Sequence, residues 1–169
     1  MKNIAIVCGS YHKEEIERML ALAKDQAEKE GLNVSEVVWV PGAMEVPLAL
    51  SRIIQDNQSG GNEIVGAACL GIIEKGQTQH GLAMGQAVLK SIIDFQISWN
   101  RPIGLGIIGP GAEPEHIEPR LEPHARAAIS AISSMLSVSI ERDFLYLKSP
   151  TKFLAIRIIV GTIATTCSI

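Results

Sequence analysis

The segment at residues 76–80 combines a glycine, a predicted helix start and a titratable ring. A helix N-terminus presents unpaired backbone N–H groups and the positive end of the helix dipole, so it can hold a phosphate without a basic cluster. The amides of Gln77 and Thr78, with the Thr78 hydroxyl, would form this site, and Thr78 would be the N-cap. His80 would lie beside it as a proton shuttle near pH 7. From the spacing alone, a threonine cap beside a surface histidine remains an alternative.

Two charged residues in other predicted loops could also contact a ligand. Arg120 follows Gly-Pro-Gly at residues 109–111, and a guanidinium there suits a bidentate contact with phosphate. A surface salt bridge with Glu118 or Glu122 is the alternative. Glu45 could accept hydrogen bonds from hydroxyls or amines, although the helix dipole alone explains a carboxylate in a first helical turn. The spacing of these residues does not choose between the alternatives.

The common metal and nucleotide motifs do not occur in the sequence. His12, His116 and His124 form neither HxxxH nor HExxH, so we expect no metal site. Walker A, GxGxxG and GxSxG patterns are missing as well. An anionic ligand would therefore have to be held by the loop segments described above.

These residues fall in the loops of an alternating β/α pattern. Apolar, β-branched runs predict buried strands at residues 4–8, 34–40, 64–70 and 103–108. Apolar residues at spacings of three and four predict helices at 13–30, 44–54, 78–98 and 123–136. We therefore expect an α/β fold, a three-layer α/β/α sandwich with a flavodoxin-like four-stranded parallel sheet. Ligands should bind at the carboxyl ends of the strands, in loops 9–12, 41–45, 71–80 and 109–120.

The predicted helix at 78–98 is apolar on more than one face. A helix with one face in water does not need so many apolar residues, so we expect this one to pack on its own sheet and on a second subunit. Packing beneath the C-terminal segment is the alternative. The apolar residues are Leu82, Ala83, Met84, Ala87, Val88, Leu89, Ile92, Ile93, Phe95 and Ile97.

Composition indicates one compact domain in a reducing compartment. The 169 residues carry a net charge of −3, which gives no general attraction to nucleic acid or to anionic membranes. Cys8, Cys69 and Cys167 are odd in number and far apart, so they fit neither a disulfide framework nor a CxxC site. Charged residues from Lys13 onward follow the first apolar run too closely for a secretory signal. We expect a cytoplasmic protein.

Several short motifs follow one another along these loops. PGAMEVP occupies residues 41–47, LGII at 70–73 leads to GQTQH at 76–80, and PIGLG at 102–106 precedes Arg120. In this combination the chain, over about residues 3–136, resembles 6,7-dimethyl-8-ribityllumazine synthase. The order of the PGAxExP and GxTxH elements makes the resemblance more specific than any single motif.

The resemblance implies a step of riboflavin biosynthesis. In that family, 5-amino-6-(D-ribitylamino)uracil condenses with 3,4-dihydroxy-2-butanone 4-phosphate to 6,7-dimethyl-8-ribityllumazine, with loss of phosphate and water. The implied route passes through an imine, elimination of phosphate and ring closure. It needs no covalent enzyme intermediate, metal or redox cofactor, so one proton shuttle and good positioning would suffice.

The resemblance also implies roles for particular residues. His80 matches the proton donor, Gln77 and Thr78 match the phosphate-binding pair, and Arg120 matches the phosphate-binding arginine. In the family the sites lie between adjacent subunits of a pentamer, and twelve pentamers can form a shell. The implied substrate-binding residues are Tyr11, which stacks on the pyrimidine; Ala43, Met44 and Glu45, which hold the ribityl chain and ring; Ile72, Ile73 and Glu74, which contact the polar edge of the pyrimidine largely through backbone groups; and Leu105, which closes the pocket from a neighbouring subunit.

The chain also departs from the family pattern. Family members commonly have Arg-Gly-Glu where residues 75–77 read Lys-Gly-Gln, and an aromatic residue followed by an acid where Gly81 and Leu82 stand. Tyr11 and Leu105 occupy positions usually held by Phe. Together with the Gly-Pro-Gly loop at 109–111, these features resemble a divergent, archaeal-type branch.

The resemblance ends near residue 138. We therefore expect a lumazine synthase-like domain at 1–138 and a C-terminal extension of unknown role at 139–169, within which residues 153–167 are apolar but interrupted by Arg157. Two alternatives remain for the domain: an archaeal-type riboflavin synthase, which has no phosphorylated substrate, and a non-catalytic flavin-binding or shell-forming protein.

Overall fold

The structure, a computed structural model, describes residues 1–58 and 63–138. Strands and helices alternate through this part of the chain, as predicted. They are β1 (Lys2–Gly9), α1 (Lys13–Lys29), β2 (Leu32–Val40), the 3₁₀ turn η1 (Ala43–Glu45), α2 (Val46–Gln58), β3 (Ile64–Glu74), α3 (His80–Trp99), β4 (Ile103–Ala112), α4 (Pro114–Ile117), the 3₁₀ turn η2 (Glu118–Arg120) and α5 (Leu121–Ser137).

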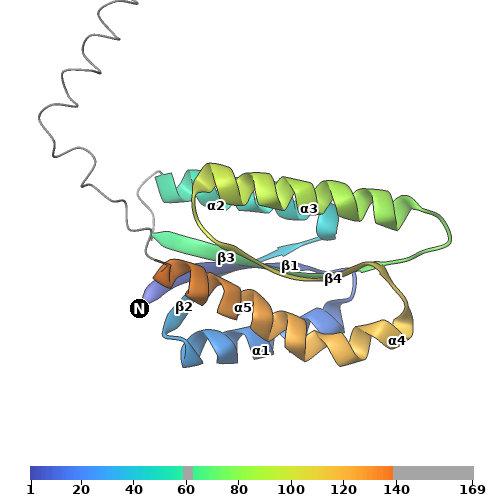
Figure 1. The fold of residues 1–169 in the computed structure, drawn as a ribbon, viewed down its shortest axis with the longest axis horizontal. Helices are drawn as coiled ribbons and strands as arrows, with labels where there is room; N and C mark the ends of the chain where they lie inside the picture. The colour runs from blue at the N-terminus through green and yellow to red at the C-terminus, as the bar shows by residue number, and fades with distance from the viewer. Residues whose placement is uncertain (59–62, 139–169) are drawn as a thin grey trace, which may run out of the picture. The chain divides into compact units, whose positions relative to one another are not determined.

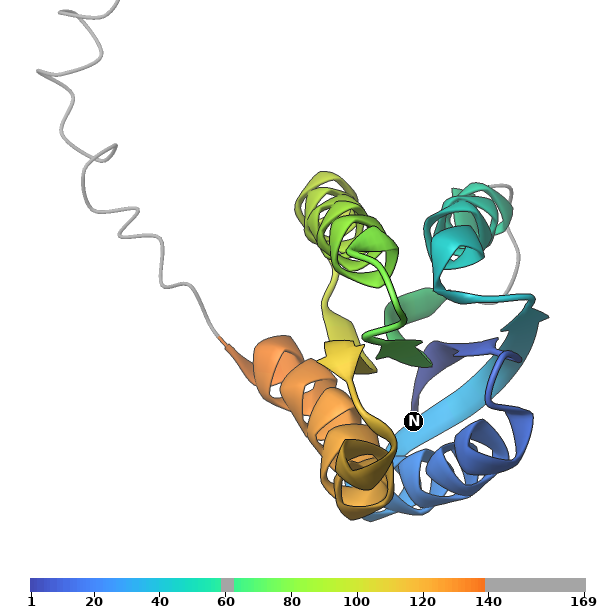
Figure 2. The ribbon, with the colours of Figure 1, turned by 90° about the vertical axis from the view of Figure 1, so that its right-hand side faces the viewer.

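The four strands form one parallel sheet in the order β2-β1-β3-β4. Figure 1 shows α2 and α3 on one face of this sheet and α1 and α5 on the other, and Figure 2 shows the same three layers from one end. Because each parallel connection needs a crossover, helices cover both faces. The predicted three-layer α/β/α sandwich with a flavodoxin-like parallel sheet is confirmed.

The central strands are buried on both faces. In β1, Ile4, Ile6 and Cys8 belong to a core that also includes α1 and α5, whereas Ala5 and Val7 belong to a second core with α2 and α3. Successive side chains of a strand point to opposite faces, so a strand between two helical layers must be apolar at every position. The continuous apolar runs that predicted the strands have this cause.

The third and fourth strands continue beyond their predicted ends. Parallel pairing persists from Ile72 with Ile108 to Glu74 with Ala112, and the Lys75 N–H donates to the Ala112 carbonyl at 2.9 Å. The prediction that the loops begin at residues 71 and 109 was therefore wrong. As a result, residues 72–74 are held on a strand.

The third helix begins later than predicted. Gln79 is the N-cap of α3 and makes no side-chain capping bond, so the prediction that Thr78 is the N-cap was wrong. Thr78 lies one residue earlier, where its hydroxyl accepts the N–H of His80 at 3.3 Å. The threonine thus holds the first helical N–H from outside the helix.

Cys8 and Cys69 are buried, free thiols in β1 and β3. They belong to different cores on opposite faces of the sheet. Burial raises the pKa of each thiol to about 12. These two thiols are therefore protonated and structural, whereas Cys167 lies outside the described residues.

The helices of the described ranges are all too short or too polar to cross a membrane. The apolar segment predicted at residues 153–167 lies outside those ranges, as does the predicted extension from residue 139 onward.

Candidate functional site

A pocket of about 460 Å³ lies at the carboxyl ends of β1, β2 and β3. Figure 1 shows this edge of the sheet on the right, where the connection from β3 to α3 turns back. In a parallel sheet this edge carries every strand-to-helix loop, which is why residues distant in sequence meet there. Its lining residues are Tyr11, Pro41, Gly42, Ala43, Met44, Glu45, Ile72, Ile73, Glu74, Gly76, Thr78, His80, Gly81 and Met84.

Nine of the twelve predicted site residues line this pocket. They come from the loop after β1, from η1, from the end of β3 and from the start of α3. Gln77 lines an adjoining pocket of about 430 Å³, which shares Gly76 and Thr78 with the first. The structure therefore brings the predicted phosphate-binding pair and the predicted proton shuttle to one continuous surface.

Leu105 and Arg120 line neither of these two pockets. Leu105 lies on β4 with 44% of its surface exposed. Arg120 lies at the end of η2, is exposed, and donates a hydrogen bond to the His116 carbonyl at 2.9 Å. The alternative, a salt bridge of Arg120 with Glu118 or Glu122, does not form: Glu118 pairs with Arg18, and Glu122 pairs with Arg126.

His80 is the first residue of α3, exposed and on the pocket wall. Its backbone N–H is held by the Thr78 hydroxyl, which fixes the start of the helix beside the ring. An imidazole can both accept and donate a proton through its ring nitrogens. This arrangement suits general acid–base chemistry on a ligand in the pocket.

Two carboxylates stand in the pocket wall with different partners. Glu45 Oε2 accepts the N–H of Gly42 at 3.0 Å, which closes the turn that begins η1. Glu74 Oε1 lies 3.1 Å from His12 Nε2. Both carboxylates are oriented by the protein before any ligand binds, and an ionised carboxylate only accepts hydrogen bonds.

His12, Gly81 and Met84 were not among the predicted site residues, yet Gly81 and Met84 line the pocket and His12 lies beside Glu74. The position of His12 in the sequence could have indicated a place near the site, because it follows Tyr11 in a loop predicted at the carboxyl edge of the sheet. Gly81 departs from the family's usual aromatic for a steric reason: a Cβ there would lie 2.4 Å from the Glu74 carbonyl oxygen. The first turn of α3 therefore packs directly on the end of β3, and an aromatic side chain does not fit in this geometry.

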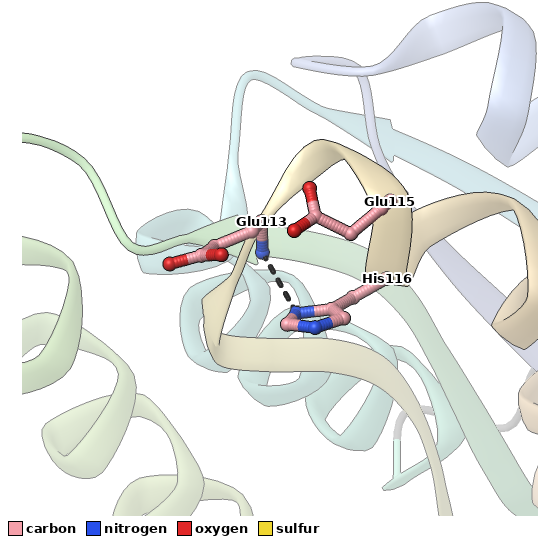
Figure 3. Close-up of side chains that lie close together, drawn as sticks. All are labelled: Glu113, Glu115 and His116. Atoms are coloured by element: carbon pink, nitrogen blue, oxygen red, sulfur yellow. Dashed lines mark hydrogen bonds between the residues drawn. The ribbon is translucent and has the colours of Figure 1, made fainter.

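Glu113, Glu115 and His116 lie close together beside the fourth loop, with ligand-type atoms within 4.8 Å of one another. Figure 3 shows the three side chains and the bond from the Glu113 N–H to His116 Nδ1, which is 3.2 Å long. Glu113 also pairs with Lys75 at 2.7 Å, and this ammonium holds the pKa of the Glu113 carboxyl below its ordinary value. Two of the three groups, Glu113 and His116, therefore already interact with other parts of the protein.

The fold and the pocket define an α/β protein of the doubly wound type, with a small-molecule site at the carboxyl edge of its sheet. The model of the 6,7-dimethyl-8-ribityllumazine synthase family matches residues 1–139, and the chain belongs to this family.

Curated relatives agree with this assignment. The 6,7-dimethyl-8-ribityllumazine synthase of Staphylothermus marinus is 32% identical over 139 residues, which are 82% of this chain and 89% of the relative. That of Picrophilus torridus is 30% identical over 82% of this chain and 97% of its own. That of Methanobrevibacter smithii is 29% identical over 77% and 91%. These organisms are archaea, in agreement with the predicted archaeal-type branch.

Proposed function

We propose that this protein catalyses the condensation of 5-amino-6-(D-ribitylamino)uracil with 3,4-dihydroxy-2-butanone 4-phosphate to 6,7-dimethyl-8-ribityllumazine, releasing phosphate and water. The observation that carries the proposal is the pocket of a chain in this family, which Thr78 and His80 line from the β3–α3 connection and Glu45 lines from the β2–α2 connection. Neither the structure nor the comparisons favour a riboflavin synthase or a non-catalytic binding protein.

The proposed roles follow from the chemistry of each group. Thr78 and Gln77 bind the phosphate at the surface shared by the two pockets, where the helix dipole favours an anion. Tyr11, 71% exposed, offers a ring face for the pyrimidine to stack on. Glu45 accepts hydrogen bonds from ribityl hydroxyls, and Ala43 and Met44 contact the same chain. His80 transfers protons during imine formation and phosphate elimination.

The remaining substrate-binding residues lie on the strands. Ile72, Ile73 and Glu74 contact the polar edge of the pyrimidine from the end of β3. Leu105 and Arg120 reach a site from an adjacent subunit, Leu105 to close it and Arg120 to bind phosphate, since neither lines the pocket of its own chain. The functional domain is residues 1–138, acting in the cytoplasm without a metal or a cofactor.

The purified chain should accelerate lumazine formation. With both substrates present, absorbance of the product should rise faster than in the spontaneous reaction, and inorganic phosphate should compete with the butanone phosphate. Absence of acceleration would overturn the proposal. Riboflavin formed from lumazine alone, insensitive to phosphate, would identify the riboflavin synthase alternative instead.

A pentamer, or a multiple of pentamers, is proposed as the working assembly. Along α3, Leu82, Ile93 and Ile97 are 43%, 54% and 71% exposed, so one side of this helix presents apolar surface that a second subunit would cover. Light scattering should give a mass that is a multiple of five times the 18.2 kDa chain. A monomeric protein would contradict this assembly and the two contributions from the adjacent subunit.

A further inference from the structure

His12 is a half-buried histidine whose inner nitrogen faces the candidate pocket wall. It lies between β1 and α1, and 19% of its side chain is exposed. Its Nε2 is fully buried and makes no hydrogen bond within the described ranges, yet it lies 3.1 Å from Glu74 Oε1. A buried polar atom is costly without a polar partner, and the Glu74 carboxylate is the polar group placed close enough to interact with it.

Two further groups lie close to the imidazole. Glu15 Oε2, at the start of α1, lies 3.9 Å from Nδ1. The Tyr11 ring meets the imidazole edge to face, with centroids 5.0 Å apart and planes at 85°. His12 therefore ties the loop after β1 to the end of β3, and it does so through the side chain of Glu74.

Glu74 is placed to act on a ligand. It lines the pocket, and 35% of its side chain is exposed, so the carboxylate is in reach of both His12 and the cavity. Among the described residues, neither a lysine nor an arginine lines this pocket. Two carboxylates in such a wall favour N–H and O–H donors and disfavour anions, which leaves a phosphate to the surface at Gly76 and Thr78.

The geometry points to two linked roles: Glu74 is a hydrogen-bond acceptor that determines substrate specificity, and His12 is the residue that positions it. The Glu74 carboxylate accepts a hydrogen bond from an N–H of the aminopyrimidine substrate, in addition to any contact made by its backbone. His12 holds the carboxylate at the angle this bond requires. This inference rests on the proposed function, since it assigns one more contact to the same site.

A matched pair of charge-neutralising variants tests the acceptor. Both Glu15 and Glu74 face the same imidazole, but only Glu74 lines the pocket. With the full chain, E74Q should raise the Kd of 5-amino-6-(D-ribitylamino)uracil alone by about tenfold, because a charge-assisted hydrogen bond becomes a neutral one. E15Q should leave this Kd unchanged, and both variants should keep the inhibition constant of inorganic phosphate. Equal pyrimidine Kd values for E74Q and E15Q would overturn the inference.

The positioning role is tested at His12 by loss and rescue. H12L should raise the pyrimidine Kd about as much as E74Q, whereas H12Q, whose amide nitrogen can replace Nε2 as a donor, should restore it. Equal Kd values for H12L and H12Q would overturn the positioning role. A wild-type chain that neither binds the pyrimidine nor accelerates the condensation would overturn the proposed function itself. A wild-type chain that does both, with Kd values unchanged in every variant, would overturn this inference alone.

Discussion

Replacing His80 with alanine should lower kcat of the proposed condensation about a hundredfold, with little change in either KM. The imidazole stands on the pocket wall at the first residue of α3, where it can move protons without binding substrate tightly. One general acid–base group contributes about a hundredfold or more, and the remaining acceleration comes from holding the two substrates together. Steady-state kinetics, corrected for the spontaneous reaction, measure the effect.

A second histidine provides the control. His124 lies on α5, the helix on the opposite face of the sheet from α3, and does not line the pocket. H124A should therefore keep the wild-type kcat. Added imidazole should restore part of the activity of H80A, because the vacated space can admit a small base. A kcat of H80A equal to that of H124A would contradict the assigned role.

The fold was predictable because the buried segments of its central strands are continuously apolar. Two helical layers bury β1 and β3 from both sides, and this leaves a continuous apolar run in the sequence. The ends of β3 and β4 were not predictable, because glycine at 71 and Gly-Pro-Gly at 109–111 are typical of loops. Pairing between the two strands carries them on to Glu74 and Ala112, and such pairing depends on residues far apart in sequence.

Nine of the twelve predicted site residues line one pocket, and most of them come from short continuous segments. Residues 43–45 and 72–80 contain local motifs, so the topology alone was enough to bring them together. The contact between His12 and Glu74 joins the loop after β1 to the end of β3, and neither residue belongs to a motif that predicts its partner. Leu105 and Arg120 line neither pocket, and the roles proposed for them depend on the proposed adjacent subunit.

Glycines in the strands allow the helices to pack closely on the sheet. Replacing one of them is therefore expected to give the largest change in stability. Gly104 lies on β4 under α5, and a Cβ built there would be 2.0 Å from the carbonyl oxygen of Ala128 and 2.7 Å from its carbonyl carbon. These are backbone atoms of a helix, so no side-chain rotation relieves the clash. G104A should lower the free energy of unfolding by about 3 kcal/mol or more, since α5 must move away from the sheet. Denaturant unfolding at a fixed protein concentration measures the loss.

Gly71 is the matched control for this substitution. It is also a buried strand glycine, on the neighbouring strand β3, but a Cβ there would lie 3.6 Å from Ile107, an ordinary contact distance. G71A should therefore be close to wild type in the free energy of unfolding. Replacing Ala128 with glycine should not restore the stability of G104A, because the clash is with the Ala128 carbonyl group. A glycine inside a helix also lowers the free energy of unfolding by about 1 kcal/mol. Two results would contradict this explanation: a G104A variant as stable as G71A, or recovery of the stability of G104A by A128G. Either would mean that Gly104 does not serve to keep the backbone of α5 in direct contact with β4.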